Sequence, residues 1–168
     1  ASEAQAENFW RIRDSISEAE RKDGPASKHD LSVEVSKMPA FMTDAAAAVE
    51  ARFPGTRVIA FGHLGDGNVH FNVRAPDGAD PGWIWDEGAA VTAFVHDLTV
   101  AAGGSISAEH GIGQMRLAEL ARTGDPARLA AMRAIKAALD PHGIMNPGKL
   151  VPPCDDAQDR LAKAPHQP

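Results

Sequence analysis

The chain has 168 residues, of which 43% are hydrophobic and 24% charged, and its net charge is −6. This composition is typical of a folded globular chain rather than a disordered one. The negative charge argues against nucleic acid or an anionic membrane as the main partner, and no segment has the length of apolar sequence that a membrane span needs.

The ends of the chain and its single cysteine bear on its processing and its cellular location. Cys154 alone excludes a disulfide framework and a cysteine-rich zinc site. The first residue is not Met and no signal-peptide pattern follows it, so we expect a processed or truncated product. We expect a cytoplasmic protein that is at most peripheral to a membrane.

The first third of the chain predicts a helix and a strand. Apolar residues recur at intervals of three and four over residues 2–22, which predicts an amphipathic helix. Arg13 and Ser17 are four residues apart and share one face of that helix. Residues 29–36 then alternate between apolar and polar types, which predicts a half-buried strand with Lys28 just before it.

Residues 61–72 carry the strongest local signal in the chain. The pair Asp66-Gly67 favours a two-residue type I′ hairpin turn, which places His63 opposite His70 and Phe61 opposite Asn72. Imidazoles so placed can converge on one metal ion, with Asn72 on the same face. The alternative is a hairpin with two solvated histidines on its outer face.

A second group of polar residues lies at residues 105–113, where Glu109 and His110 stand among glycines. Glu109 can complete a metal site with the two hairpin histidines, and His110 then remains free to move a proton. Both roles require the chain to bend here, because neighbouring side chains of a regular strand point to opposite faces. The glycines of residues 111–113 imitate a dinucleotide fingerprint, but Arg116 occupies its third glycine position and no βαβ unit surrounds it.

The order of elements predicts an α+β protein, with an antiparallel sheet and helices packed on one of its faces. The further elements are a helix over 39–53, hairpin strands over 56–64 and 68–74, and helices over 86–102, 116–122 and 126–139. We divide the chain into residues 1–110, the latter part of a substrate- and metal-binding domain, a helical segment over 111–150, and a loosely ordered tail over 151–168.

Three blocks of sequence resemble the C-terminal part of the FAD-linked oxidases that act on D-2-hydroxy acids such as D-lactate, D-2-hydroxyglutarate and glycolate, in the vanillyl-alcohol-oxidase-like superfamily. They are residues 62–70 (Gly-His-Leu-Gly-Asp-Gly-Asn-Val-His), 107–113 (Ser-Ala-Glu-His-Gly-Ile-Gly) and 145–149 (Met-Asn-Pro-Gly-Lys). A weaker match runs from Trp10 through Arg13 to Lys28 and Asp30. Glu34 departs from the family, whose members commonly carry proline there.

The resemblance implies a role for each candidate residue. His63, His70 and Glu109 would bind Zn²⁺ or Mn²⁺, and His110 would be the general base. Substrate would be held by Arg13, Ser17, Lys28 and Asn72, and Asn146 would lie near the flavin. The fold would be an incomplete ferredoxin-like substrate domain followed by C-terminal helices that pack toward an FAD domain.

The function expected from this resemblance is the oxidation of a D-2-hydroxy acid to the 2-oxo acid, with hydride passing to FAD held outside this chain. The partners would be the small substrate, a missing FAD-binding domain or partner chain, and an electron acceptor that the sequence does not identify. A homo-oligomer is also compatible with the sequence. Two other functions stay open: a stand-alone metal-binding module, and a metal-dependent hydrolase in which Glu109 or His110 activates water.

Overall fold

The structure is a computed structural model that describes residues 2–22 and 24–153. Cys154 and most of the expected tail over 151–168 lie outside the described residues. The chain divides into two compact units, Ala1–Ala108 and Glu109–Pro168. Within the described residues, no helix combines the length and the apolar character that crossing a membrane requires.

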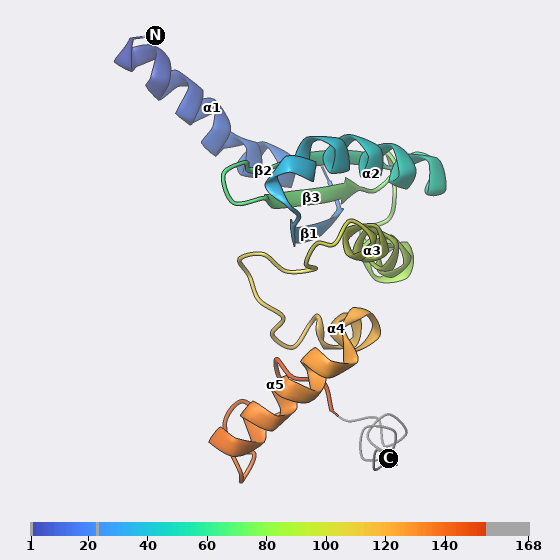
Figure 1. The fold of residues 1–168 in the computed structure, drawn as a ribbon. Helices are drawn as coiled ribbons and strands as arrows, with labels where there is room; N and C mark the ends of the chain where they lie inside the picture. Colours follow the sequence, from blue (N-terminus) through green and yellow to red (C-terminus); the bar gives the residue numbers. More distant parts are fainter. Residues whose placement is uncertain (1, 23, 154–168) are drawn as a thin grey trace. The chain divides into compact units, whose positions relative to one another are not determined.

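The first unit is an antiparallel sheet with helices, which confirms the predicted α+β class (Figure 1). Its strands lie in the order β1-β3-β2, so β3 is central and pairs with a neighbour on each side. In chain order the elements are α1 (Glu3–Lys22), β1 (Ala26–Ser32), the 3₁₀ helix η1 (Val35–Lys37), α2 (Met38–Arg52), β2 (Arg57–His63), β3 (Asn68–Arg74) and α3 (Trp83–Ala101).

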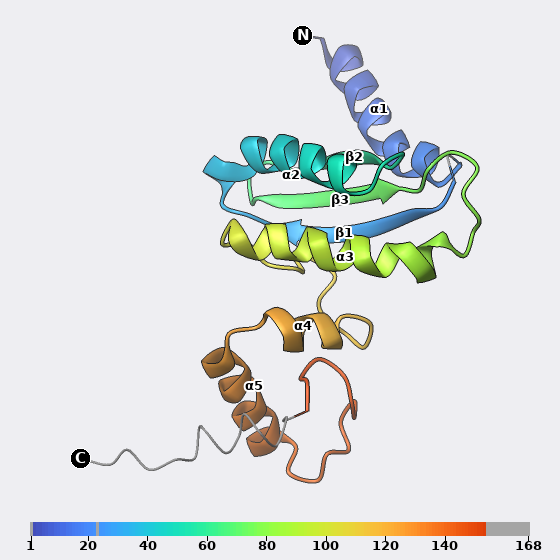
Figure 2. The same cartoon turned by 90° about the vertical axis from the view of Figure 1, so that its right-hand side faces the viewer.

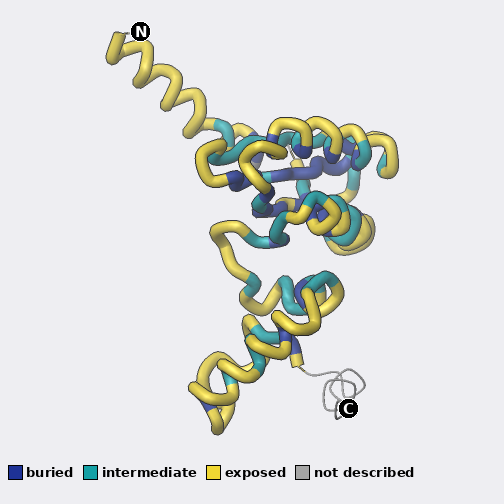
Figure 3. The backbone as a smooth tube through the Cα atoms, viewed as in Figure 1, coloured by how far each residue is buried: buried dark blue, intermediate teal, exposed yellow. Residues whose placement is uncertain are grey.

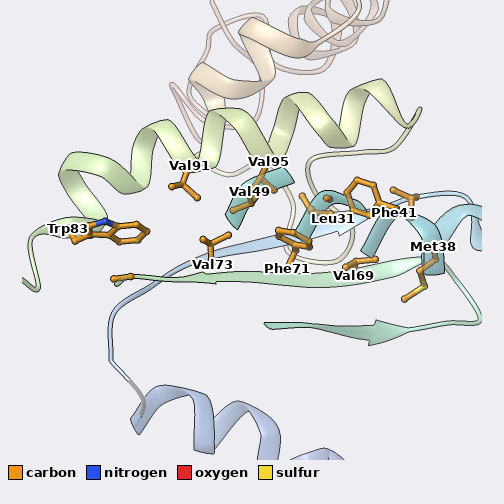
Figure 4. Close-up of a cluster of buried hydrophobic side chains, with 13 residues drawn as sticks. Leu31, Met38, Phe41, Val49, Val69, Phe71, Val73, Trp83, Val91 and Val95 are labelled. Atoms are coloured by element: carbon orange, nitrogen blue, oxygen red, sulfur yellow. The ribbon is translucent and has the colours of Figure 1, made fainter. Parts of the chain in front are cut away.

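The hydrophobic core lies on one face of this sheet, beneath α2 and α3 (Figures 2 and 4). Val69, Phe71 and Val73 of β3 are completely buried, because alternate residues of a strand point to the same face. Leu31 of β1 joins them, and in Figure 4 Val91 and Val95 point from α3 toward the sheet. Burying each such side chain contributes about 1.5–3 kcal/mol, so β3 anchors the unit. Figure 3 draws most of this strand in the dark blue of buried residues.

The first strand ends earlier than its sequence pattern predicts. β1 covers Ala26–Ser32, so Lys28 lies within it and the predicted extension to residue 36 is wrong. The alternating pattern continues past the strand because Val33 is still buried, but its N–H donates to the carbonyl of Gly67 (N···O 3.0 Å) instead of continuing a strand ladder. Val35, which the pattern placed inside, begins η1 and is exposed.

The hairpin between β2 and β3 has a different register from the one predicted. His63 pairs with Asn68 and Phe61 pairs with His70, so the predicted pairing is wrong by two residues. The turn contains four residues, 64–67, and is closed by the amides of Asp66 and Gly67, which both donate to the carbonyl of His63 (3.3 and 3.1 Å). Positive φ occurs at Gly67 but not at Asp66, whereas a type I′ turn needs it at both central residues.

Glycine is required at position 67 because the backbone of Val33 lies against it. A Cβ at this position would lie 2.0 Å from the carbonyl oxygen of Val33, and the residue has φ +74°. The close approach lets Gly67 accept the amide of Val33, which ties the hairpin turn to the end of β1. Gly65, in the same turn, has open space around its Cα.

Gly67→Ala should therefore destabilise the chain while Gly65→Ala should not. The first substitution combines a left-handed conformation, which costs a non-glycine residue about 1–2 kcal/mol, with a backbone clash, so we expect a loss of at least roughly 2 kcal/mol. The second should stay within about 0.5 kcal/mol of the parent. Urea unfolding followed by circular dichroism measures both, and equal effects would contradict the packing of Gly67 on Val33.

The second unit contains α4 (Leu117–Thr123) and α5 (Pro126–Leu139). Both helices lie where the sequence predicts them, and the range of α5 agrees at both ends. Asp125 caps α5 by accepting the amide of Arg128 (2.9 Å), and Pro126 occupies the first turn, where its missing N–H has no cost.

Candidate functional site

The sheet face opposite the core carries polar side chains. Asn68, His70 and Asn72 alternate with the core residues of β3, and β1 places Ser32, Asp30 and Lys28 directly opposite these three. Asn68, Asn72 and Asp30 are at most 4% exposed. A row of buried polar groups destabilises a fold unless the groups are satisfied, so their presence here indicates a built site.

His63 and His70 lie together on this face although the predicted register is wrong. A shift of two residues leaves every side chain of a strand on its original face. Their rings are 5.8 Å apart between centroids and nearly perpendicular, and His63 is held at the end of β2 by the two turn amides that its carbonyl accepts.

The two imidazoles fit a shared metal ion. With metal–nitrogen distances of about 2.0–2.1 Å, two imidazoles on one tetrahedral ion have centroids roughly 5 Å apart. The observed 5.8 Å is close to this value. Imidazole is a ligand for Zn²⁺ and for neighbouring transition metals, whereas calcium and magnesium prefer oxygen.

Arg13 of α1 reaches this pair. Its Nη2 lies 2.9 Å from Nε2 of His63, across 50 residues of sequence. A guanidinium has only donors, so Nε2 accepts and carries the ring's lone pair. Ser17 lies one turn along the same helix and is exposed. The arrangement places a fixed cation beside an unprotonated ring nitrogen.

Glu20, which the sequence reasoning missed, holds Lys28. Its Oε2 accepts a hydrogen bond from Nζ of Lys28 (3.1 Å), and the Glu20 side chain is 2% exposed while that of Lys28 is 50% exposed. Glu20 follows Arg13 by seven residues and Ser17 by three, so all three share one helical face. That spacing could have indicated that Glu20 lies beside Arg13 and Ser17, but a glutamate on a helix usually faces solvent.

Lys28→Met should destabilise the chain more than Lys22→Met, although both remove a lysine paired with a glutamate of α1. Lys22 pairs with Glu18 (2.9 Å) where both side chains are over 70% exposed, and such pairs contribute about 0.3–0.5 kcal/mol. Losing Lys28 leaves the carboxylate of Glu20 buried without its cation, which we expect to cost roughly 1–2 kcal/mol after allowing for the exposure of Lys28.

Urea unfolding of the two variants and the parent gives this comparison directly. Hydrogen exchange of the α1 amides should also rise in Lys28→Met and not in Lys22→Met. A Lys28→Met variant as stable as the parent would show that Glu20 is not held by this pair.

The second unit carries Glu109, His110 and Asn146. The backbone bends over residues 108–110, as the sequence reasoning required, and Glu109 and His110 are exposed. Asn146 has φ +47°, an unusual conformation for a residue other than glycine, in the turn that its carbonyl closes by accepting the amide of Lys149 (3.3 Å). These residues belong to a different unit from the two histidines.

The loop before Asn146 is organised by the buried carboxylate of Asp140. Its oxygens accept the amides of Ile144 (3.0 Å) and Met145 (2.9 Å), and its Oδ2 also pairs with Nζ of Lys136. The hydrogen bond from Lys136 lowers the pKa of Asp140 most, burial opposes this, and the two amides lower it further. Lys136 additionally donates to the carbonyl of Met145 (2.6 Å), so the same lysine holds both ends of the loop.

Acid should release this loop. Because folding lowers the pKa of Asp140, its contribution is complete above the ordinary pKa of aspartate, about 3.9, and is lost as the pH falls through the lower folded value. The amide resonances of Ile144 and Met145 should therefore titrate together below about pH 4 in NMR spectra. Asp140→Asn should abolish that titration, and a titration that persists in Asp140→Asn would assign it to another group.

Comparison with known proteins places this chain in a family. The family described as FAD linked oxidases, C-terminal domain, matches residues 1–150. The chain belongs to this family. The match includes the sheet face with its histidines, the bend at residues 108–110 and the loop around Asn146.

Relatives of this FAD linked oxidase domain are considerably longer proteins. A protein named D-2-hydroxyglutarate dehydrogenase from Stutzerimonas stutzeri is 42% identical over 149 residues, which cover 89% of this chain and 32% of the relative. The proteins named D-2-hydroxyglutarate dehydrogenase, mitochondrial, from Arabidopsis thaliana and Bos taurus are 38% and 34% identical, over 88% and 90% of this chain and 25% and 27% of theirs. The chain thus spans about a quarter to a third of these curated relatives.

Proposed function

We propose that this chain is the substrate- and metal-binding portion of a flavin-dependent dehydrogenase that oxidises a D-2-hydroxy acid to the 2-oxo acid. The observation that carries the proposal is the His63–His70 pair beside Arg13 on a buried polar sheet face, in a chain of the FAD linked oxidase family. The relatives' names support D-2-hydroxyglutarate as the substrate.

Arg13 and Lys28, two of the cationic side chains of the first unit, suit a substrate with two carboxylates. Arg13 and Lys28 come from different elements, α1 and β1, and are 48% and 50% exposed at their side chains, so each can reach a ligand. The guanidinium of Arg13 offers a bidentate fork to one carboxylate, and Lys28 offers a point charge to the other. Asn72 lies directly opposite Lys28 in the sheet and, with Ser17, adds neutral hydrogen bonds.

His63 and His70 would bind Zn²⁺ or Mn²⁺, with Glu109 as a third ligand. A bound divalent cation lowers the pKa of an alcohol that it contacts. The lone pair that His63 directs to Arg13 is the one a metal needs, so metal binding would release the guanidinium to a carboxylate. His110 would take the proton of the substrate hydroxyl, and Asn146 would lie beside FAD, which accepts the hydride and is held outside this chain.

Metal binding can be tested on the chain itself. We expect close to one equivalent of Zn²⁺ after dialysis, measured by elemental analysis, and a clear loss in His63→Ala, in His70→Ala and in the double variant. His142→Ala is the matched control, since His142 is an exposed histidine of the second unit. Unchanged zinc content in the double variant would remove the metal assignment.

Catalysis needs a form of the protein that also holds the flavin. In that form D-2-hydroxyglutarate should bleach the flavin absorbance, and His110→Asn should slow bleaching by roughly 10²–10⁴-fold, the usual loss for a general base, while keeping its metal. Glu109→Gln should instead lower metal content. Turnover of an ester or amide without flavin would favour the hydrolase, and metal binding without any turnover would favour the stand-alone module.

A further inference from the structure

We propose that Asp30 is a positioning residue, which holds His70 in the tautomer that a metal needs and fixes the start of the segment that carries Glu109 and His110. This inference rests on the proposed metal site. Asp30 lies directly opposite His70 in the β1–β3 register and is 1% exposed. Its carboxylate is therefore set by the strand pairing and not by a flexible loop.

The carboxylate acts on one particular ring nitrogen. Oδ1 of Asp30 lies 3.9 Å from Nδ1 of His70, beyond a direct hydrogen bond but within the range of an electrostatic or water-bridged contact. A negative charge on that side favours a proton on Nδ1, which leaves the lone pair on Nε2. Carboxylates behind metal-bound histidines have this effect in many metal sites, because they fix the tautomer and the ring orientation.

The other sides of the His70 ring are also occupied. Phe61 lies opposite His70 on β2, with ring centroids 5.3 Å apart, and His63 lies diagonally from it at 5.8 Å. The ring of Phe61 limits rotation of the His70 ring, while the charge of Asp30 favours one of its two flipped orientations. Packing alone cannot make that choice, because the two flips have nearly the same shape.

Asp30 also anchors the backbone that leaves the first unit. Its backbone carbonyl and its Oδ2 both lie 3.1 Å from the amide nitrogen of Ala108, and Glu109 is the next residue in the chain. One side chain thus contacts a hairpin histidine and the residue that precedes the second pair of candidate groups. A buried carboxylate is costly to desolvate, and a role toward a bound cation explains why it is retained here.

Nitrogen-15 NMR of the histidine side chains tests the tautomer in the parent chain. In spectra recorded at about pH 8, we expect His70 to carry its proton on Nδ1. A proton on Nε2 in the parent would overturn the proposal without any variant. In Asp30→Asn, which preserves the shape but removes the charge, the two tautomers should become mixed.

Zinc affinity gives the second readout, with Zn²⁺ alone as the probe in competition with a chromophoric chelator. Asp30→Asn should weaken binding by roughly 10–100-fold, the usual loss for a residue that supports a ligand. Thr99→Val is the control for buried hydrogen-bond loss, since Thr99 is fully buried in α3 and its hydroxyl donates to the carbonyl of Val95 (2.8 Å), and its affinity should not change.

The outcomes separate this inference from the proposed function. If His63→Ala and His70→Ala lower affinity but Asp30→Asn leaves both affinity and tautomer unchanged, only the role of Asp30 is wrong. A loss in Asp30→Asn as large as in His70→Ala would make Asp30 a metal ligand, which also overturns the positioning role. If the parent binds no zinc, the metal site fails, and the tautomer measurement still decides whether Asp30 orders His70.

Discussion

The central strand β3 separates two chemically opposite environments, and the rest of the first unit depends on that separation. Its odd-numbered residues 69, 71 and 73 are completely buried under α2 and α3, and its even-numbered residues 68, 70 and 72 form the middle of the polar face. Both neighbouring strands pair with it, so a single register fixes which side chains of β1 and β2 reach each face. A slip of one residue along β3 would exchange the core for the site.

The fold class and most elements could be predicted from the sequence because they depend on local periodicity. α5 and the α+β order follow from apolar spacing, Pro126 and the glycine-containing turns. The errors occur where a distant contact overrides the local pattern. β1 ends at Ser32 because Val33 bonds to Gly67, and the hairpin turn has four residues because Gly67 packs against Val33. Neither residue indicates the other in the sequence, since 33 positions separate them.

Part of the site could be predicted because the register error is an even number of residues. Errors of an even number of residues preserve the face of each side chain, so the placement of His63 and His70 on one face survived the wrong register. Asn68 and Glu20 were missed. Their burial comes from the β1–β3 pairing and from the position of α1, neither of which a strand or helix pattern specifies. Both side-chain polar atoms of Asn68, and Oε1 of Glu20, lack a hydrogen-bond partner within residues 2–22 and 24–153.

Those unsatisfied atoms have an energetic cost for the fold. Polar groups withdrawn from water lose solvation, and the fold recovers that loss elsewhere through the completely buried residues of the opposite face. Charges on the polar face act through a medium of low dielectric, where electrostatic interactions are stronger than in water. Asp30 can therefore bias the position of the proton on His70, and Glu20 can hold Lys28 more firmly. The amide of Asn68 lies between His63 and Ser32 in the sheet. The strand pairing that buries these groups therefore also gathers their polar atoms on one face of the sheet.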